Sequence, residues 1–220
     1  MIIGISGYSG SGKDSIGSII QYLFAEKNGV TLVEPIEVVA ANSSKFELEL
    51  DNLSGWEVRK FAGKLKDIAS HLTGIDIEDF EDQDFKKTNL GREWWTTCDE
   101  GWQPMTVRDF LQKLGTDAMR NGLHDNVWVN ALMADYKPDE DGDLPNWVIT
   151  DTRFPNEAKA IKDKGGIIIR IDRPFIKPIN DHPSETGLDN WKFDYKIANI
   201  SDLFSLKFTV ENILKLEKLL

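Results

Sequence analysis

A glycine-rich segment near the N-terminus has the residue types that bind a polyphosphate. Residues 7–13 read Gly-Tyr-Ser-Gly-Ser-Gly-Lys, which fits G-x-x-x-x-G-K, and they lie between an apolar run and a helical pattern. Glycines let backbone N–H groups surround phosphate oxygens, while the helix N-terminus and the lysine add positive charge. A glycine-rich turn without a ligand is the alternative, which the flanking patterns disfavour. We therefore predict a nucleotide-phosphate site formed by Gly7, Ser9, Gly10, Ser11, Gly12, Lys13, Asp14 and Ser15.

The residue after the lysine departs from the usual pattern. Asp14 stands where Ser or Thr is expected, and the hydroxyl comes one position later, at Ser15. We expect Ser15 to help hold Mg²⁺. Two interpretations of Asp14 stay open. An acid in the first turn stabilises a helix by itself, or its carboxylate pairs with an arginine or an acceptor hydroxyl near the phosphates.

Charged residues follow two further apolar runs, each typical of an inner strand. Asp151 and Arg153 come after residues 147–150, and Arg173 comes after residues 167–171. Ligands of α/β sheets bind outside the carboxyl ends of the strands, so we expect Asp151 and Arg153 to face one crevice. Asp151 is the candidate to organise Mg²⁺ together with Ser15. The alternative for Asp151 and Arg153 is an ion pair on the surface.

Short apolar runs alternate with helical patterns along the chain, which is the order typical of a parallel sheet covered by helices. The acidic stretch over residues 76–101 interrupts this order, and we expect it to leave the main sheet. The expected strands cover residues 1–6, 36–41, 147–150 and 167–171. The expected helices cover residues 16–28, 58–74, 106–122, 157–164 and 206–220, with one more beginning near Asp125.

Composition and charge limit the class of protein. The 220 residues include 26 Lys and Arg against 37 Asp and Glu, a net charge of −11, which argues against a protein that coats nucleic acid. With 40% hydrophobic and 29% charged residues, we expect a single globular domain over residues 1–220. A lone Cys98 and three scattered histidines support neither a disulfide nor a metal cluster. The sequence shows no export or membrane signal, so the expected location is the cytoplasm.

Six segments along the chain carry a resemblance to a known family. They cover residues 7–15, 61–66, 106–116, 128–129, 151–158 and 182–185. Together they resemble the bacteriophage deoxynucleoside monophosphate kinases. The resemblance implies an α/β fold of the P-loop NTPase type, a three-layer sandwich with a mostly parallel central sheet. It also implies an inserted acceptor-binding helical region over about residues 55–125 and a lid-like loop over about 173–190. Lys64 and Val107 stand where prolines are expected, which leaves the base preference open.

The same resemblance implies how the acceptor is bound. Arg108 would hold its monophosphate and Gln112 its base or sugar. Residues 108, 112, 116 and 120 recur every four positions, and in an α-helix such a row turns by about 40° at each step. We therefore expect Arg120 about 120° away from Arg108 around the helix. The alternative is a solvated polar face. The acceptor-binding residues would be Phe61, Lys64, Lys66, Arg108, Gln112, Thr116 and Arg120.

The implied activity is transfer of the γ-phosphoryl group of ATP to a (deoxy)nucleoside monophosphate, with Mg²⁺ as the cofactor. Two alternatives stay open: a related kinase of the dephospho-coenzyme A or phosphomevalonate type, and a non-catalytic protein gated by a nucleotide. The expected partners are small nucleotides, with no nucleic acid and no membrane, and a homodimer stays open. If a phage encodes the chain, its location is the host cytoplasm. The catalytic residues would be Lys13, Arg108, Asp151, Arg153 and, in the lid, Arg173.

Overall fold

The chain folds into two compact units. The computed structural model describes residues 1–98, 101–178 and 182–220. The first unit consists of Met1–Lys60 and Ala134–Leu220, and the second of Phe61–Met133. Within the described residues, no helix is long and apolar enough to cross a membrane.

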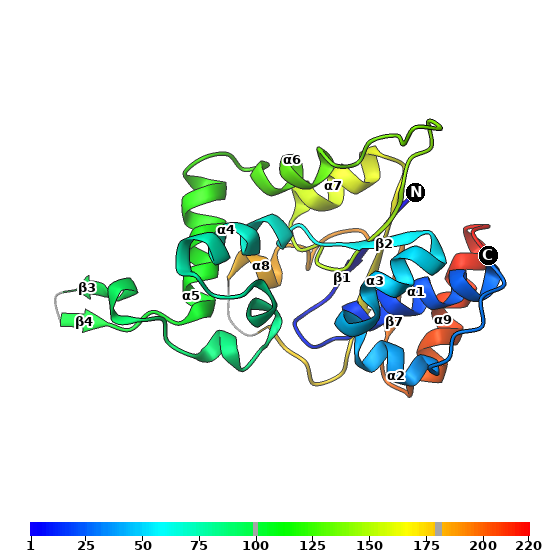
Figure 1. The fold of residues 1–220 in the computed structure, drawn as a ribbon, viewed down its shortest axis with the longest axis horizontal. Helices are drawn as coiled ribbons and strands as arrows, with labels where there is room; N and C mark the ends of the chain where they lie inside the picture. Colours follow the sequence, from blue (N-terminus) through cyan, green and yellow to red (C-terminus); the bar gives the residue numbers. More distant parts are fainter. Residues whose placement is uncertain (99–100, 179–181) are drawn as a thin grey trace. The chain divides into compact units, whose positions relative to one another are not determined.

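A five-stranded parallel sheet forms the centre of the first unit (Figure 1). Its strands are β1 (Ile2–Ser6), β2 (Trp56–Arg59), β5 (Asn146–Ile149), β6 (Ile167–Asp172) and β7 (Tyr195–Ala198). They follow the order β2-β5-β1-β6-β7, and every neighbouring pair is parallel. Ile3 of β1 lies opposite Val148 of β5 and Ile167 of β6. The segments that leave β1, β5 and β6 therefore start side by side at one edge of the sheet.

Helices cover both faces of this sheet. They are α1 (Lys13–Lys27), α2 (Ile36–Ala41), α3 (Ser43–Ser54), α7 (Pro155–Asp163) and α9 (Leu203–Leu216), and the short helix α8 (Pro183–Thr186) lies between β6 and β7 in the chain. On one face, Ile3 and Ile5 of β1 share a buried cluster with residues of α1, α2, α3 and α9. On the other face lies Gly4, where a Cβ atom would be only 2.6 Å from Cδ1 of Ile161 in α7. The predicted α/β sandwich with a parallel central sheet is confirmed.

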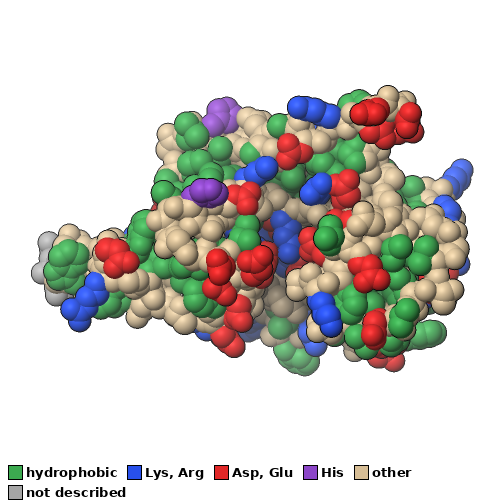
Figure 2. All heavy atoms as spheres, in the orientation of Figure 1, with side chains coloured by type: hydrophobic (Ala, Val, Ile, Leu, Met, Phe, Trp, Pro, Cys, Tyr) green, Lys and Arg blue, Asp and Glu red, His purple; other side chains and the backbone are tan. Residues whose placement is uncertain are grey.

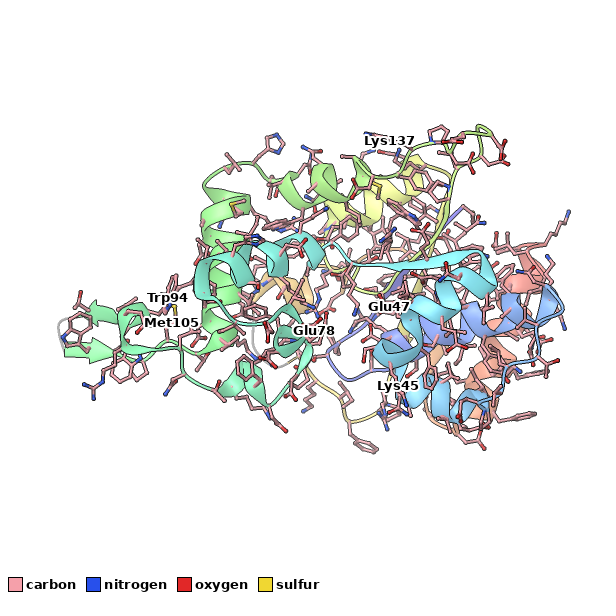
Figure 3. All side chains as sticks on the ribbon, in the orientation of Figure 1. Lys45, Glu47, Glu78, Trp94, Met105 and Lys137 are labelled. Atoms are coloured by element: carbon pink, nitrogen blue, oxygen red, sulfur yellow. The ribbon has the colours of Figure 1, made fainter. Side chains whose placement is uncertain are left out.

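The second unit is mostly helical and has a small core of its own. It contains α4 (Gly63–Thr73), α5 (Val107–Gln112) and α6 (Val127–Met133), three 3₁₀ turns (Ile77–Glu81, Phe85–Lys87 and Arg92–Trp94), and a hairpin of β3 (Thr96–Cys98) and β4 (Gly101–Gln103). Trp94 meets the Phe110 ring edge-on, with ring centres 4.9 Å apart, and Met105 packs on the same core (Figure 3). Trp94 therefore packs against the hydrophobic core of the second unit.

Two predicted elements are wrong. Residues 36–41 form α2 rather than a strand, because the buried residues Ile36, Val39 and Ala40 recur with helical spacing although two of the three are β-branched. The helix expected over residues 58–74 begins only at Gly63, since Val58 belongs to β2 and pairs with Val148. The strands expected at 147–150 and 167–171 and the helices expected at 157–164 and 206–220 are confirmed within a few residues.

Candidate functional site

The glycine loop connects β1 to α1 at the carboxyl edge of the sheet. Gly10 and Gly12 have φ angles of 79° and 106°, a region that residues with side chains rarely adopt. Gly7 fills a different need, because a Cβ atom there would lie 2.5 Å from the carbonyl oxygen of Ile171. Asn199, after β7, donates a hydrogen bond of 3.0 Å to the carbonyl oxygen of Ser11. The loop is thus fixed from two neighbouring strands, with the first turn of α1 directly behind it.

Lys13 is a buried cation inside this loop. Lys13 is only 7% exposed, and its Nζ donates hydrogen bonds to the carbonyl oxygens of Gly7 and Tyr8, both at 2.9 Å. Burial and, second to it, the positive charge of Arg153 lower the pKa of Lys13 to about 8. The carboxylates of Asp14, Glu185 and Asp151 act in the opposite direction. Lys13 is therefore the centre of a group of charged side chains.

Asp14 joins the first turn of α1 to neighbouring segments of the sheet. Its Oδ1 atom accepts a hydrogen bond of 2.9 Å from the hydroxyl of Thr150 and lies 3.6 Å from Nζ of Lys60. The hydroxyl of Ser15 donates to the carbonyl oxygen of Ala40 at 3.2 Å. These contacts favour the interpretation in which Asp14 stabilises the local structure, with Lys60 as a cationic neighbour.

Asp151 and Arg153 leave the end of β5 beside the glycine loop. Asp151 is half-buried, and its charge acts on Lys13. Nη1 of Arg153 donates to Oε1 of Glu185 at 2.8 Å and to the carbonyl oxygen of Ser184 at 3.3 Å. Oε2 of Glu157 accepts hydrogen bonds from the backbone N–H groups of Arg153 and its successor at 2.7 and 3.0 Å. Arg153 is therefore held at both its backbone and its side chain.

The two arginines at the end of β6 have different surroundings. Arg170 is buried, its Nε donates to Asp172 at 2.9 Å, and its guanidinium carbon lies 4.6 Å from the centre of the Tyr8 ring. The Tyr8 hydroxyl donates to Asp189 at 3.0 Å, and burial together with this carboxylate raises the pKa of Tyr8. Arg173 is exposed, and its Nη1 donates to the carbonyl oxygen of Gly10 at 3.5 Å. Of the lid-like loop expected over 173–190, residues 179–181 lie outside the described part of the chain.

The first unit thus brings four of the predicted catalytic residues to the glycine loop. Lys13 lies within it, Asp151 and Arg153 act on Lys13, and Arg173 contacts Gly10. No role is predicted from the sequence for Thr150, Glu157, Glu185 or Asn199, although Glu157 and Glu185 lie in two of the segments that carry the family resemblance. Glu157 and Glu185 carry a local signal, because each is the third residue after the N-cap of a helix that starts with proline, where an acid can cap backbone N–H groups. The other contacts join residues far apart in the sequence.

The predicted acceptor residues lie in the second unit, where several already have protein partners. Nη2 of Arg108 donates to Oε1 of Gln83 at 3.0 Å, and Lys66 forms an ion pair with Glu81. Arg120 is buried, and its Nη1 donates to the carbonyl oxygen of Asp125 at 3.3 Å. Phe61 is also buried, Lys64 is exposed, and Gln112 and Thr116 are half-buried.

The helix that carries this row changes its geometry after Gln112. α5 continues as a π-helix, labelled η4 (Lys113–Asn121). With hydrogen bonds from i to i+5, the helix has about 4.4 residues per turn. A step of four residues then falls about 30° short of a full turn, whereas in an α-helix it passes a full turn by about 40°. With ideal π-helix geometry from Lys113 on, Arg120 lies about 25° from Arg108 around the axis, so the 120° expected for an α-helix does not apply. The carbonyl oxygen of Gly115, in this segment, accepts a hydrogen bond of 2.9 Å from Nε1 of Trp128.

Acidic side chains lie mainly on the outer surface. Figure 2 shows a group of them on the loop before β5, where residues 139–143 include Asp139, Glu140, Asp141 and Asp143. In the second unit, the acids of residues 76–84 are exposed as well. The net charge of −11 is therefore compatible with a cationic loop in which Lys13 is buried.

Comparisons with known proteins agree with the resemblance. The family model described as deoxynucleotide monophosphate kinase matches residues 46–210. A putative deoxynucleotide monophosphate kinase of Acanthamoeba polyphaga mimivirus is 38% identical over 115 residues, 47% of this chain and 58% of that protein. The deoxynucleotide monophosphate kinase of Enterobacteria phage T4 is 28% identical over 141 residues, 64% of this chain and 57% of that protein.

A further relative is similar over nearly its whole length. The deoxynucleoside-5'-monophosphate kinase of Escherichia phage T5 is 25% identical over an alignment of 254 positions, which covers 99% of this chain and 97% of that protein. The matches to the mimivirus and T4 proteins cover less than three fifths of those proteins.

Proposed function

This chain belongs to the deoxynucleotide monophosphate kinase family, and on that premise we propose that it transfers the γ-phosphoryl group of ATP to a (deoxy)nucleoside monophosphate. The observation that carries the proposal is the buried ammonium group of Lys13 inside a glycine loop, with Asp151 and Arg153 acting on it. The family match does not favour a dephospho-coenzyme A or phosphomevalonate kinase, nor a non-catalytic nucleotide-gated protein.

In this proposal the glycine loop holds ATP. The backbone N–H groups of residues 9–13 donate to phosphate oxygens, and Lys13 exchanges its two carbonyl partners for the outer phosphates. The hydroxyl of Ser11 supports this role, because its oxygen is buried without a hydrogen-bond partner among the described residues. Gly10 and Gly12 permit the backbone to curl around the phosphates, which a side chain at either position would prevent.

Ser15 and Asp151 would hold Mg²⁺. A hydroxyl and a carboxylate are hard oxygen donors, and magnesium sites of kinases usually combine one or two such groups with water and substrate phosphates. This donor set fits the ion, and Asp151 is close enough to act on Lys13. When bound, Mg²⁺ neutralises charge on the phosphates of ATP. Ser15 has to turn its hydroxyl away from the carbonyl oxygen of Ala40 for this role.

We propose the second unit as the region that binds the acceptor. Arg108 is half-buried, reaches Gln83 and would bind the monophosphate, while Gln112 would bind the base or sugar. Because the π-helix keeps one row of residues aligned, Thr116 shares a face with them. Phe61, Lys64, Lys66 and Arg120 complete the proposed set. The burial of Phe61 and Arg120 and the ion pair of Lys66 give these three a supporting role around the site.

The chemistry of such a transfer is mainly electrostatic. A nucleoside monophosphate already carries a charge near −1.5 to −2, so no general base is needed, and the repulsion between two anions is the obstacle. Lys13, Arg153 and Arg173 neutralise the transferring phosphoryl group, and Arg108 neutralises the acceptor phosphate. Fixed cations cost no reorganisation during the reaction, which is why the rigid setting of Arg153 matters.

The test is an ADP-release assay with Mg²⁺, ATP and a panel of acceptors. The panel contains the four common deoxynucleoside monophosphates, their ribose counterparts and modified pyrimidine deoxynucleotides. We expect at least one acceptor to accelerate ADP formation, and Lys13→Ala to abolish this acceleration. Lys27→Ala, at the exposed other end of α1, is the matched control and should keep it. A folded protein whose ADP formation no acceptor accelerates would overturn the proposal.

A further inference from the structure

The carboxylate of Glu185 is buried against Arg153. Glu185 lies in α8, within the segment expected to form the lid, and its side chain is only 4% exposed. Oε1 accepts the hydrogen bond of 2.8 Å from Nη1 of Arg153. The carbonyl oxygen of Ser184 accepts from the same nitrogen at 3.3 Å. Removing the partner of a buried charge is costly, so this pair is expected to persist.

The backbone of α8 also packs directly on Arg153. A Cβ atom at Gly187 would lie 2.9 Å from the carbonyl oxygen of Arg153, so the two segments approach each other more closely than a side chain would permit. Glu157 holds the backbone N–H of Arg153 from its own helix at 2.7 Å. Arg153 is thus held by hydrogen bonds at its N–H and at one terminal nitrogen, and its carbonyl oxygen is closely approached by the backbone of Gly187.

The remaining edge of the guanidinium group is available. Among the described residues, Nε and Nη2 of Arg153 have no hydrogen-bond partner, because its side-chain bonds all come from Nη1. These two N–H groups point along one edge of a planar group, which matches two oxygens of a phosphate. Glu185, which accepts its hydrogen bond from Nη1, therefore leaves the Nε–Nη2 edge of Arg153 available to a phosphate.

We propose that Glu185 is the positioning residue that orients Arg153 toward the transferring phosphoryl group. The inference rests on the proposed function, and it assigns Glu185 no contact with either substrate. The carboxylate of Glu185 accepts the hydrogen bond from Nη1. The backbone of Arg153 is held by Glu157 and packed against Gly187. The Nε–Nη2 edge of Arg153 then binds the phosphate oxygens. A structural ion pair that only fastens α8 to the sheet is the competing explanation.

The two explanations differ in whether Glu185→Gln lowers kcat or only the stability of the fold. If Glu185 acts through Arg153, Glu185→Gln lowers kcat by about tenfold in the otherwise unchanged chain and by less than about twofold in an Arg153→Ala background. The KM for ATP stays within about twofold, since Lys13 and the loop still bind the nucleotide. A structural pair instead lowers the melting temperature of the otherwise unchanged chain, while kcat measured well below that temperature stays within about twofold.

The experiment measures kcat, both KM values and the melting temperature for the full chain, Glu185→Gln, Arg153→Ala and the double variant. Asp194→Asn is the matched control, because Asp194 pairs with Lys162 and Ile168 in the same unit without touching Arg153. We expect the control to keep kcat. If Glu185→Gln does not fold, Glu185→Asp tests the same ratio, since it keeps the charge but shortens the reach.

The outcomes separate the inference from the proposed function. No turnover by the unchanged, folded chain with any acceptor overturns both. If the unchanged chain turns over, two results overturn the positioning role alone. One is that Glu185→Gln lowers kcat by the same factor with and without Arg153. The other is that Glu185→Gln leaves kcat unchanged. Loss of kcat that disappears when Arg153 is removed supports it.

Discussion

Thr150 donates a hydrogen bond of 2.9 Å to Oδ1 of Asp14, so the residue that follows β5 is joined directly to the first turn of α1. Gly17, one turn further along α1, completes this junction, because a Cβ atom there would lie 2.8 Å from Cγ2 of Thr150. The glycine loop and the Asp151 segment are therefore connected through their supporting elements. The residue that departs from the usual loop pattern, Asp14, forms that connection.

Thr150→Val should destabilise the protein by about 1–2 kcal/mol, because it removes the hydroxyl while keeping the shape of the side chain. Thr150 is 1% exposed, whereas the side chain of Asp14 is 57% exposed, so water can solvate the carboxylate and the loss stays within this range. Urea unfolding measures the change. Thr209→Val, which removes an exposed hydroxyl of α9, is the control and should change stability by less than about 0.5 kcal/mol. Equal effects of the two variants would contradict the structural interpretation of Asp14.

ATP affinity should fall as the pH rises through about 8, the pKa of Lys13. Nearby phosphates favour the charged form, so they raise the pKa of Lys13 in the complex, and binding above pH 8 then requires uptake of a proton. The affinity should decrease toward about tenfold per pH unit above that value, while below it Lys13 is charged in both states. Calorimetry at pH 8.5 in two buffers of different ionisation enthalpy measures the proton uptake. A Lys13→Met variant that takes up the same number of protons would assign the effect to another group.

Gly7→Ala should destabilise the protein by about 2 kcal/mol or more and weaken ATP binding. The added Cβ atom meets the carbonyl oxygen of Ile171 and Oγ of Ser11, both at 2.5 Å, and backbone cannot yield easily. Gly29→Ala is the comparison, because Gly29 has a φ of 82° but no atom within 4 Å of the added carbon. Its cost should be limited to backbone strain of about 1 kcal/mol, with ATP binding unchanged. Thermal melting and nucleotide titration of both variants check this difference.

The sequence predicts the parts of the site that depend on neighbouring residues. The glycine loop and the residues after β5 and β6 are recognisable because a strand end and a turn pattern are local features. The supports of the site are different, since Thr150 and Asp14 are 136 positions apart and Arg153 and Glu185 are 32 apart. Such pairs come together only when the sheet is packed, so the spacing of apolar residues along the sequence does not predict them.

The predicted secondary structure also differs from the observed one in two segments of the chain. The row through Arg108 and Arg120 was interpreted as an α-helix, and nothing in the residue types around Gly115 announces a π-helix. In the same way Ile36–Ala41 looked like a strand by composition, although its buried positions follow a helical period. Tertiary packing decided both cases.

Arg170 and Arg173 should separate stability from catalysis. Arg170→Ala should cost about 3 kcal/mol, because it removes a buried guanidinium together with its charged hydrogen bond to Asp172 and its contact over the Tyr8 ring. Arg173→Ala should change stability by less than about 0.5 kcal/mol but lower kcat, since this exposed side chain donates to the carbonyl oxygen of Gly10 in the loop. Unfolding and steady-state kinetics of the two variants provide the comparison. A stable Arg170→Ala with normal kcat would remove the case for its structural role.

Arg108→Ala and Arg120→Ala should differ in the same way within the second unit. Arg108 is half-buried and bonded to the exposed Gln83, so its loss should raise the acceptor KM or lower kcat by about tenfold while ATP binding is retained. Arg120 is buried and donates to the carbonyl oxygen of Asp125, so its removal should lower the melting temperature first. Acceptor kinetics at saturating ATP, an ATP titration and thermal melting distinguish the two. If Arg120→Ala melts normally and raises the acceptor KM as much as Arg108→Ala does, the π-helix places both arginines on the substrate, and the acceptor surface extends along the whole row.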